Sequence, residues 1–149
     1  MVDGQLRPTK VTDTRILDSM GVLPREMFTE KARQGVAYID EDIEVAPGRY
    51  MMEPVVLARL VQALNVGAND SVLVIGAGTG YDAALIGTLA GPVVAIEVDA
   101  ALVETASMVI SHLGIDNVAV VEAALAEGYP AQAPFDLVFF CGAVPEVPA

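Results

Sequence analysis

Three glycines at alternate positions, followed by an acid, are the residues of this sequence with the clearest chemical potential. Gly76, Gly78 and Gly80 follow an apolar run, and Glu97 comes roughly 20 positions later, at the end of another apolar run. Glycines let the backbone turn sharply and approach a ligand that a Cβ would push away. A carboxylate at the next strand end can accept both hydroxyls of a ribose. The pattern predicts a nucleotide-binding crevice; the alternative is a tight strand-to-helix connection without a ligand.

The spacing of the glycines distinguishes between two cofactors. A dinucleotide fingerprint has the spacing Gly-x-Gly-x-x-Gly, and its third glycine would fall on Tyr81 here. The spacing therefore favours S-adenosylmethionine over a nicotinamide cofactor, while a nicotinamide-dependent oxidoreductase stays open as an alternative. The residues expected to bind the cofactor are Gly76, Ala77, Gly78, Thr79, Gly80 and Glu97.

The elements around the glycines alternate between helices and strands. Apolar residues at helical spacing are followed by short runs of Val, Leu and Ile, which is typical of right-handed βαβ units and a parallel sheet. The expected fold is α/β, a Rossmann-like, doubly wound and mainly parallel sheet. The expected helices span residues 54–64, 81–90 and 99–113, and the expected strands span residues 72–75, 93–96, 117–121 and 137–140.

One domain is expected over residues 1–149, because this length suits a single core. Within it, residues 1–52 are expected to form a helical and lid segment, and residues 53–149 the cofactor-binding βαβ core.

The first segment contains weaker patterns than the core. A short helix is predicted near residue 12, ended by Gly21, and a second helical turn is predicted at residues 24–28. Residues 35–49 contain several acids and end in Pro-Gly-Arg, so we expect an extended lid or loop rather than core, with its acids forming a solvated surface.

Composition and charge exclude several classes of function. Hydrophobic residues make up 54% of the chain and the mean hydropathy is +0.52, which is typical of parallel sheets buried on both faces. The net charge of −12 repels phosphate backbones, so no nucleic-acid partner is expected. No apolar stretch reaches the ~20 residues of a membrane span, and the first residues do not resemble a secretory signal. A single cysteine, Cys141, fits a reducing cytoplasm, and no His or Cys pairs suggest a metal site.

Several strings along the chain, taken together in order, resemble the protein-L-isoaspartate O-methyltransferase family. They cover nearly the whole sequence, and the strings outside the glycine motif are more specific than the glycines. The matching strings are Gln5-Leu6-Arg7, Leu23-Pro24-Arg25-Glu26-Met27-Phe28, Ala37-Tyr38-Ile39-Asp40, residues 72–81, Val94-Ala95-Ile96-Glu97, residues 113–118, Glu127-Gly128-Tyr129-Pro130 and Ala133-Pro134-Phe135-Asp136.

The resemblance implies an activity, a cofactor and a partner. Enzymes of this family transfer a methyl group from S-adenosylmethionine to the α-carboxyl group of isoaspartyl residues in damaged proteins, which begins their repair. By resemblance, Gly76, Gly78 and Gly80 form the turn under the methionine part of the cofactor, and Glu97 binds the ribose. The expected partner is a protein or peptide with isoaspartyl residues.

Two segments depart from the family pattern. The family serine with a catalytic or substrate-positioning role corresponds to Met52, so that Tyr50, Met52 and Glu53 are the substrate-side candidates. The family's adenine-binding acid falls within Ala123-Ala124-Leu125. A methionine offers no useful hydrogen bond, which implies weaker isoaspartyl activity. The alternative function is therefore a catalytically degenerate member that binds the cofactor or a protein.

The resemblance also implies that the chain is truncated after the fourth strand. The strand at residues 137–140 would then lie beside the glycine-motif strand and leave one apolar edge uncovered. Either the chain is a fragment of a longer protein, or this edge pairs with another copy; the first account is favoured.

Overall fold

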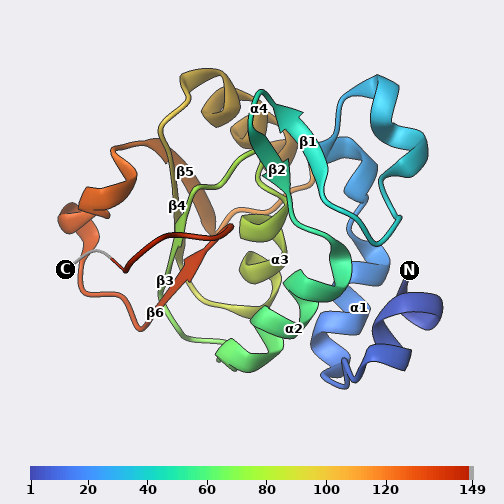
Figure 1. Ribbon diagram of the computed structural model, residues 1–149. Coiled ribbons are helices and arrows are strands. Elements are labelled where there is room, and N and C mark those ends of the chain that lie inside the picture. The colour runs from blue at the N-terminus through green and yellow to red at the C-terminus, as the bar shows by residue number, and fades with distance from the viewer. Residues whose placement is uncertain (148–149) are drawn as a thin grey trace.

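The computed structural model describes residues 1–147 and has an α/β architecture built on a four-stranded sheet (Figure 1). The strands lie in the order β5-β4-β3-β6 and all neighbours are parallel. This order confirms the predicted mainly parallel sheet, including the position of the last strand beside the glycine-motif strand. The strands are β3 (Val72–Ile75), β4 (Val93–Glu97), β5 (Val118–Glu122) and β6 (Leu137–Phe140).

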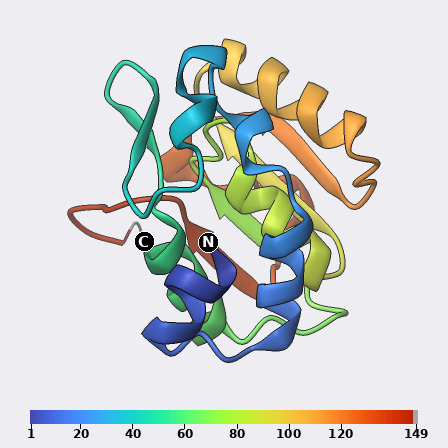
Figure 2. The ribbon, with the colours of Figure 1, turned by 90° about the vertical axis from the view of Figure 1, so that its right-hand side faces the viewer.

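Helices cover one face of the sheet in two layers. In Figure 2, α1 and α3 lie side by side in front of the strands, and α4 runs beside them. Helix α3 has no polar face because it is enclosed between the sheet and the N-terminal helices, and nearly all of its residues are buried. The helices are α1 (Thr14–Val22), α2 (Pro54–Leu64), α3 (Tyr81–Leu89) and α4 (Ala100–His112).

The opposite face of the sheet is covered by the connection between β5 and β6. Leu73, Val94 and Ile96 form a second small core there, against which Leu125 and Tyr129 pack. This connection contains two short 3₁₀ turns, at Leu125–Glu127 and Pro130–Gln132. The chain thus changes face between β5 and β6 and returns beside β3. A crevice at the carboxyl ends of β3 and β6 follows from this reversal, as in other doubly wound sheets.

An antiparallel hairpin precedes α2 and corrects one prediction. Strand β1 (Ile43–Ala46) lies within residues 35–49, which were predicted to form a lid or loop rather than core, and it pairs with β2 (Arg49–Met51), which begins at the last of these residues. The side chains of Ile43 and Val45 are buried and belong to the main hydrophobic core. Ile43 and Val45 alternate with Glu44, which is the period-two pattern of a half-buried strand. This pattern was hard to recognise in the sequence because acids surround it.

The acids near the hairpin bind the start of α2. The Asp42 carboxylate accepts a hydrogen bond from the Glu53 amide at 2.8 Å, and the Asp40 carboxylate accepts one from the Val55 amide at 3.0 Å. The side chain at the N-cap position, Glu53, makes no capping bond itself. These acids are exposed, as predicted, but they also supply a cap that is distant in the sequence.

Local boundaries differ from the predictions in small ways. Helix α1 continues through Gly21 to Val22, because glycine costs only about 1 kcal/mol inside a helix whose other face is packed. In α2, Leu57, Ala58 and Val61 are buried, whereas Leu60 is 44% exposed. Within residues 1–147, no helix is long and apolar enough to cross a membrane. The remaining short helical turns span Val2–Leu6, Arg7–Thr9, Arg25–Phe28 and Lys31–Val36.

Candidate active site

The glycine turn between β3 and α3 has the conformation that its sequence requires. Gly76, Gly78 and Gly80 have φ angles of +82°, +56° and +97°, a region that side chains with a Cβ rarely adopt. The amides of Gly76 and Ala77 both donate to the carbonyl of Ile96, which fixes the turn against the end of β4.

The glycines differ in what lies in front of them. A Cβ on Gly80 would come within 3.0 Å of the Ala106 Cβ, so this glycine permits close packing of α3 against α4. A Cβ on Gly78 would meet nothing within 4 Å. The space in front of Gly78 is where a ligand can approach the backbone.

Glu97 ends β4 as predicted, but its carboxylate is fully buried and already occupied. Arg49 donates two hydrogen bonds to it, at 2.7 Å to Oε1 and 2.6 Å to Oε2. Three backbone amides also donate to it, those of Gly78, Val98 and Asp99, at 2.7, 2.8 and 3.1 Å. The carboxylate therefore holds the glycine turn and the β1–β2 hairpin together at the end of the sheet.

These contacts keep Glu97 ionised. Burial raises the pKa of its carboxyl group, but the hydrogen bonds from Arg49 and from the Gly78 and Asp99 amides outweigh burial, and the net pKa is lowered. The hydrogen bonds to Glu97 likewise raise the pKa of the Arg49 guanidinium, against the effect of burial. The result is a charged pair at neutral pH.

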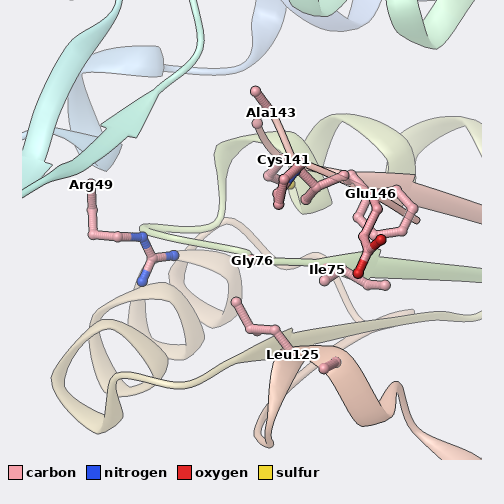
Figure 3. Close-up of a pocket in the computed structure, with 12 residues that line it drawn as sticks. Arg49, Ile75, Gly76, Leu125, Cys141, Ala143 and Glu146 are labelled. Carbon is pink, nitrogen blue, oxygen red and sulfur yellow. The ribbon is translucent and has the colours of Figure 1, made fainter. Parts of the chain in front are cut away.

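A cavity of about 440 Å³ opens beside this pair, at the carboxyl ends of β3 and β6. Figure 3 shows the Arg49 side chain at one end of the cavity and Glu146 at the other, with Leu125 pointing in from the opposite face. A second cavity of about 330 Å³ adjoins it under the hairpin and is lined by Arg49, Tyr50 and Gly78, among others. Their combined size is within the range of small-molecule sites.

The segment expected to contact adenine has an apolar character. Of Ala123-Ala124-Leu125, Leu125 lines the larger cavity, together with the neighbouring Ala126 and with Ile75 and Phe140. This is the place where the family pattern has an acid, so an adenine ring here would meet apolar side chains rather than a carboxylate.

The three substrate-side candidates differ in whether they line a cavity. Tyr50 is 58% exposed and lines the cavity under the hairpin. Met52 packs against the core, and its carbonyl accepts a hydrogen bond from Arg25 at 2.7 Å. Met52 and Glu53 lie outside the lining of the two cavities described above. Of the three candidates, Tyr50 alone lines either of these cavities.

Two further residues lie beside the glycine turn, and the sequence patterns gave neither of them a role in the site. Asp82 is buried in the first turn of α3, and it lines a narrow recess beside the glycine turn with Cys141, the residue that follows β6. Burial raises the pKa of Asp82 to about 6, although Cys141 and Arg25 partly lower it. Burial also raises the pKa of the Cys141 thiol. The sequence feature that could have indicated Asp82 is the presence of an acid in an otherwise apolar helix.

The residues present fit a nucleoside cofactor. The open space before Gly78, the apolar walls and the carboxylate of Glu97 match a methionine tail, an adenine ring and a ribose respectively. The occupied state of Glu97 is the one feature that a cofactor would have to change. Within residues 1–147, no cluster of three or more His, Cys, Asp or Glu side chains is arranged to hold a metal ion.

The doubly wound sheet, the glycine turn and the acid ending the next strand define a Rossmann-like methyltransferase domain of the S-adenosylmethionine-dependent class. The family model described as protein-L-isoaspartate(D-aspartate) O-methyltransferase matches residues 2–149, and the chain belongs to this family. The resemblance drawn from the sequence is thereby confirmed, and the nicotinamide alternative is left without support.

Relatives of known name agree with this assignment. The chain is 38% identical over 148 residues to a protein-L-isoaspartate O-methyltransferase of Koribacter versatilis, covering 99% of this chain and 67% of the relative. It is 36% identical over 148 residues to one of Rhodopseudomonas palustris, covering 99% of this chain and 68% of the relative. The chain thus spans about two thirds of the length of these relatives.

Solved structures show the same fold. A protein-L-isoaspartate O-methyltransferase superposes with a TM-score of 0.85 at 29% identity, covering 95% of this chain and 47% of the other. A Plasmodium falciparum protein, solved in complex with S-adenosyl-L-homocysteine, superposes with a TM-score of 0.76 at 18% identity, covering 95% of this chain and 72% of the other. The second likeness concerns the fold alone.

Proposed function

We propose that this chain is the cofactor-binding part of a cytoplasmic carboxyl methyltransferase that acts on isoaspartyl residues of damaged proteins. The observation that carries the proposal is the cavity beside the glycine turn, at the carboxyl ends of β3 and β6, where the sheet reverses direction. In the proposed assignment, Gly76, Ala77, Gly78, Thr79 and Gly80 cradle the cofactor, and Glu97 binds its ribose.

The chemistry requires positioning more than acid–base catalysis. Bound S-adenosylmethionine supplies a methyl group on a sulfonium, and an acceptor carboxylate is ionised at neutral pH, so no general base is needed. The residues of this chain have to hold the acceptor in line and exclude water. The residue proposed to contact the acceptor is Tyr50, a proposal supported by its exposed side chain on the lining of the smaller cavity.

The test is a calorimetric titration with S-adenosylhomocysteine. The 149-residue chain should bind it saturably, and Glu97→Ala should weaken binding roughly 10- to 100-fold, because hydrogen bonds to a charged group contribute about 1.5–3 kcal/mol. Glu122→Ala is the matched control, since Glu122 pairs with Glu97 in the sheet register and is exposed.

Two further measurements separate the parts of the proposal. Equal affinity in parent and Glu97→Ala would remove Glu97 from the site. Binding of the nucleoside without methyl transfer to an isoaspartyl peptide would retain the cofactor assignment and reject the repair activity, as expected for a degenerate member.

A further inference from the structure

The hydrogen bonds on Glu97 leave no room for a ribose while Arg49 is bound. Its two oxygens accept five hydrogen bonds, two from Arg49 and three from backbone amides. A carboxylate offers about four lone-pair positions, so two ribose hydroxyls cannot be added to this set. The amides belong to the glycine turn and to the end of β4, whereas Arg49 is a long side chain. Arg49 is therefore the donor that has to leave.

Among the residues within 1–147 that line the site, Arg49 is also the only cation. Asp42 and Glu146, which line the two adjoining cavities with it, are acidic. The whole chain has a net charge of −12. A carboxylate that enters this site is repelled by its surroundings unless a guanidinium meets it.

The structure already shows how Arg49 binds a carboxylate. Its Nη1 and Nη2 atoms each donate to a separate oxygen of Glu97, which is the bidentate arrangement that guanidinium groups favour. Arg49 is fixed in β2, where it pairs with Ala46, and it lies beside Tyr50 on the lining of the smaller cavity. A guanidinium released from Glu97 stays near this cavity because its backbone does not need to move.

We propose that Arg49 binds the carboxylate of the methyl acceptor and that cofactor binding releases it for this role by displacing it from Glu97. The inference rests on the proposed function and adds a residue that recognises the acceptor. Arg49 is thus a positioning residue, and it supplies the polar contact that Met52 cannot. The acceptor class is a carboxylate on a peptide, and binding is ordered, with the cofactor first.

The test compares Arg49→Gln, Arg49→Lys and the control Arg59→Gln, which removes the same charge from an exposed position on α2. Each protein is titrated at pH 8 with S-adenosylhomocysteine. The protein saturated with this nucleoside is then titrated with an isoaspartyl peptide, and with the same peptide carrying an amide in place of the carboxylate.

Two opposite changes are expected from Arg49→Gln. Affinity for S-adenosylhomocysteine rises about tenfold, because the competitor for Glu97 is gone, and affinity for the isoaspartyl peptide falls at least about tenfold, to that of the amide peptide. Arg49→Lys restores part of the peptide affinity, and Arg59→Gln behaves as the parent does. A merely structural role would not move the two affinities in opposite directions.

Other outcomes overturn the inference. Unchanged peptide affinity in Arg49→Gln rejects the acceptor role, and unchanged or weaker nucleoside binding rejects the competition for Glu97. If the parent binds S-adenosylhomocysteine but no isoaspartyl peptide, the acceptor role fails while the cofactor site of the proposed function stands. If the parent binds no nucleoside, both fail.

Discussion

The guanidinium of Arg25 lies over the ring of Tyr81, with 4.7 Å between Cζ and the ring centre. Phe28 meets the same ring edge-on, with the ring centres 5.3 Å apart. Tyr81 begins α3, at the position where a dinucleotide-binding turn would have its third glycine. The fully buried Arg25 also donates to the carbonyls of Ala37 and Met52. Tyr81 therefore joins the N-terminal segment to the cofactor helix.

Truncation of Tyr81 should destabilise the fold. Its side chain is 1% exposed, so Tyr81→Ala is expected to lower the free energy of unfolding by about 3–5 kcal/mol, as measured by urea denaturation. Its hydroxyl is buried without a hydrogen-bond partner among residues 1–147. Tyr81→Phe, the matched control, should thus match the parent or exceed its stability by up to about 1 kcal/mol. A large loss in the phenylalanine variant would contradict this account of the ring.

Asp82 should make stability depend on pH in the acidic range. Its pKa is raised from 3.8 to about 6 in the folded chain, chiefly by burial, so the folded state binds the proton more tightly than the unfolded state. The free energy of unfolding should therefore fall as pH rises from about 4 to about 6, because Asp82 loses its proton in the unfolded state first. Above about pH 6 the full cost of burying the ionised carboxylate is present. Asp82→Asn should match the parent near pH 4 and exceed it by up to about 3 kcal/mol at pH 7–8.

Urea denaturation of both proteins across pH 4–8 measures this difference. A constant difference over the whole range would show that ionisation of Asp82 costs the fold nothing.

Alanine substitutions at two glycines of the turn should have different effects, because Gly80 permits close helix packing and Gly78 faces the space for a ligand. Gly80→Ala is expected to lower the free energy of unfolding by about 2–4 kcal/mol, because φ is +97° and the new Cβ would meet Ala106 at 3.0 Å. Gly78→Ala faces open space and should cost only about 1–2 kcal/mol for its positive φ. In the nucleoside titration, however, Gly78→Ala should bind at least about tenfold more weakly than the parent. Equal binding would place the ligand elsewhere.

The outer edge of β6 should promote self-association. Within residues 1–147, β6 pairs with β3 on one side and with no strand on the other, and Val138 is 43% exposed. We expect the sedimentation-derived mass of the 149-residue chain to increase with concentration, and Val138→Lys to reduce this increase, because a charge on an edge strand opposes pairing. A monomer that persists at every concentration would reject this prediction.

Local sequence patterns were sufficient for the sheet and the cofactor turn. The runs at residues 72–75 and 93–96 are short, branched and apolar, and the glycine spacing determines the turn that follows the first of them. Glu97 could be placed because the ends of adjacent parallel strands meet at one edge of the sheet. Each of these inferences depends on neighbours within a few residues or on the regular geometry of βαβ units.

The contacts of Arg49 could not be predicted in the same way. Arg49 and Glu97 are 48 residues apart and belong to different sheets, so no periodic pattern connects them. The sequence indicated only that Arg49 directly precedes Tyr50, a substrate-side candidate. The hairpin was missed because its two strands are short and acids surround them, and such composition is typical of loops. Long-range pairing of side chains depends on how the hairpin packs, which is a property of the tertiary structure.

The cap that Asp40 and Asp42 provide links the order of the segment before the hairpin to the order of α2. The first amides of α2 have no partner in their own helix, and they depend on carboxylates 15 and 11 residues earlier in the chain. If the segment before the hairpin lifts, these amides become exposed to solvent and the helix frays from its first turn. Hydrogen–deuterium exchange at Val55 therefore reports opening of the segment before the hairpin, and this segment and α2 gain or lose order as one cooperative unit.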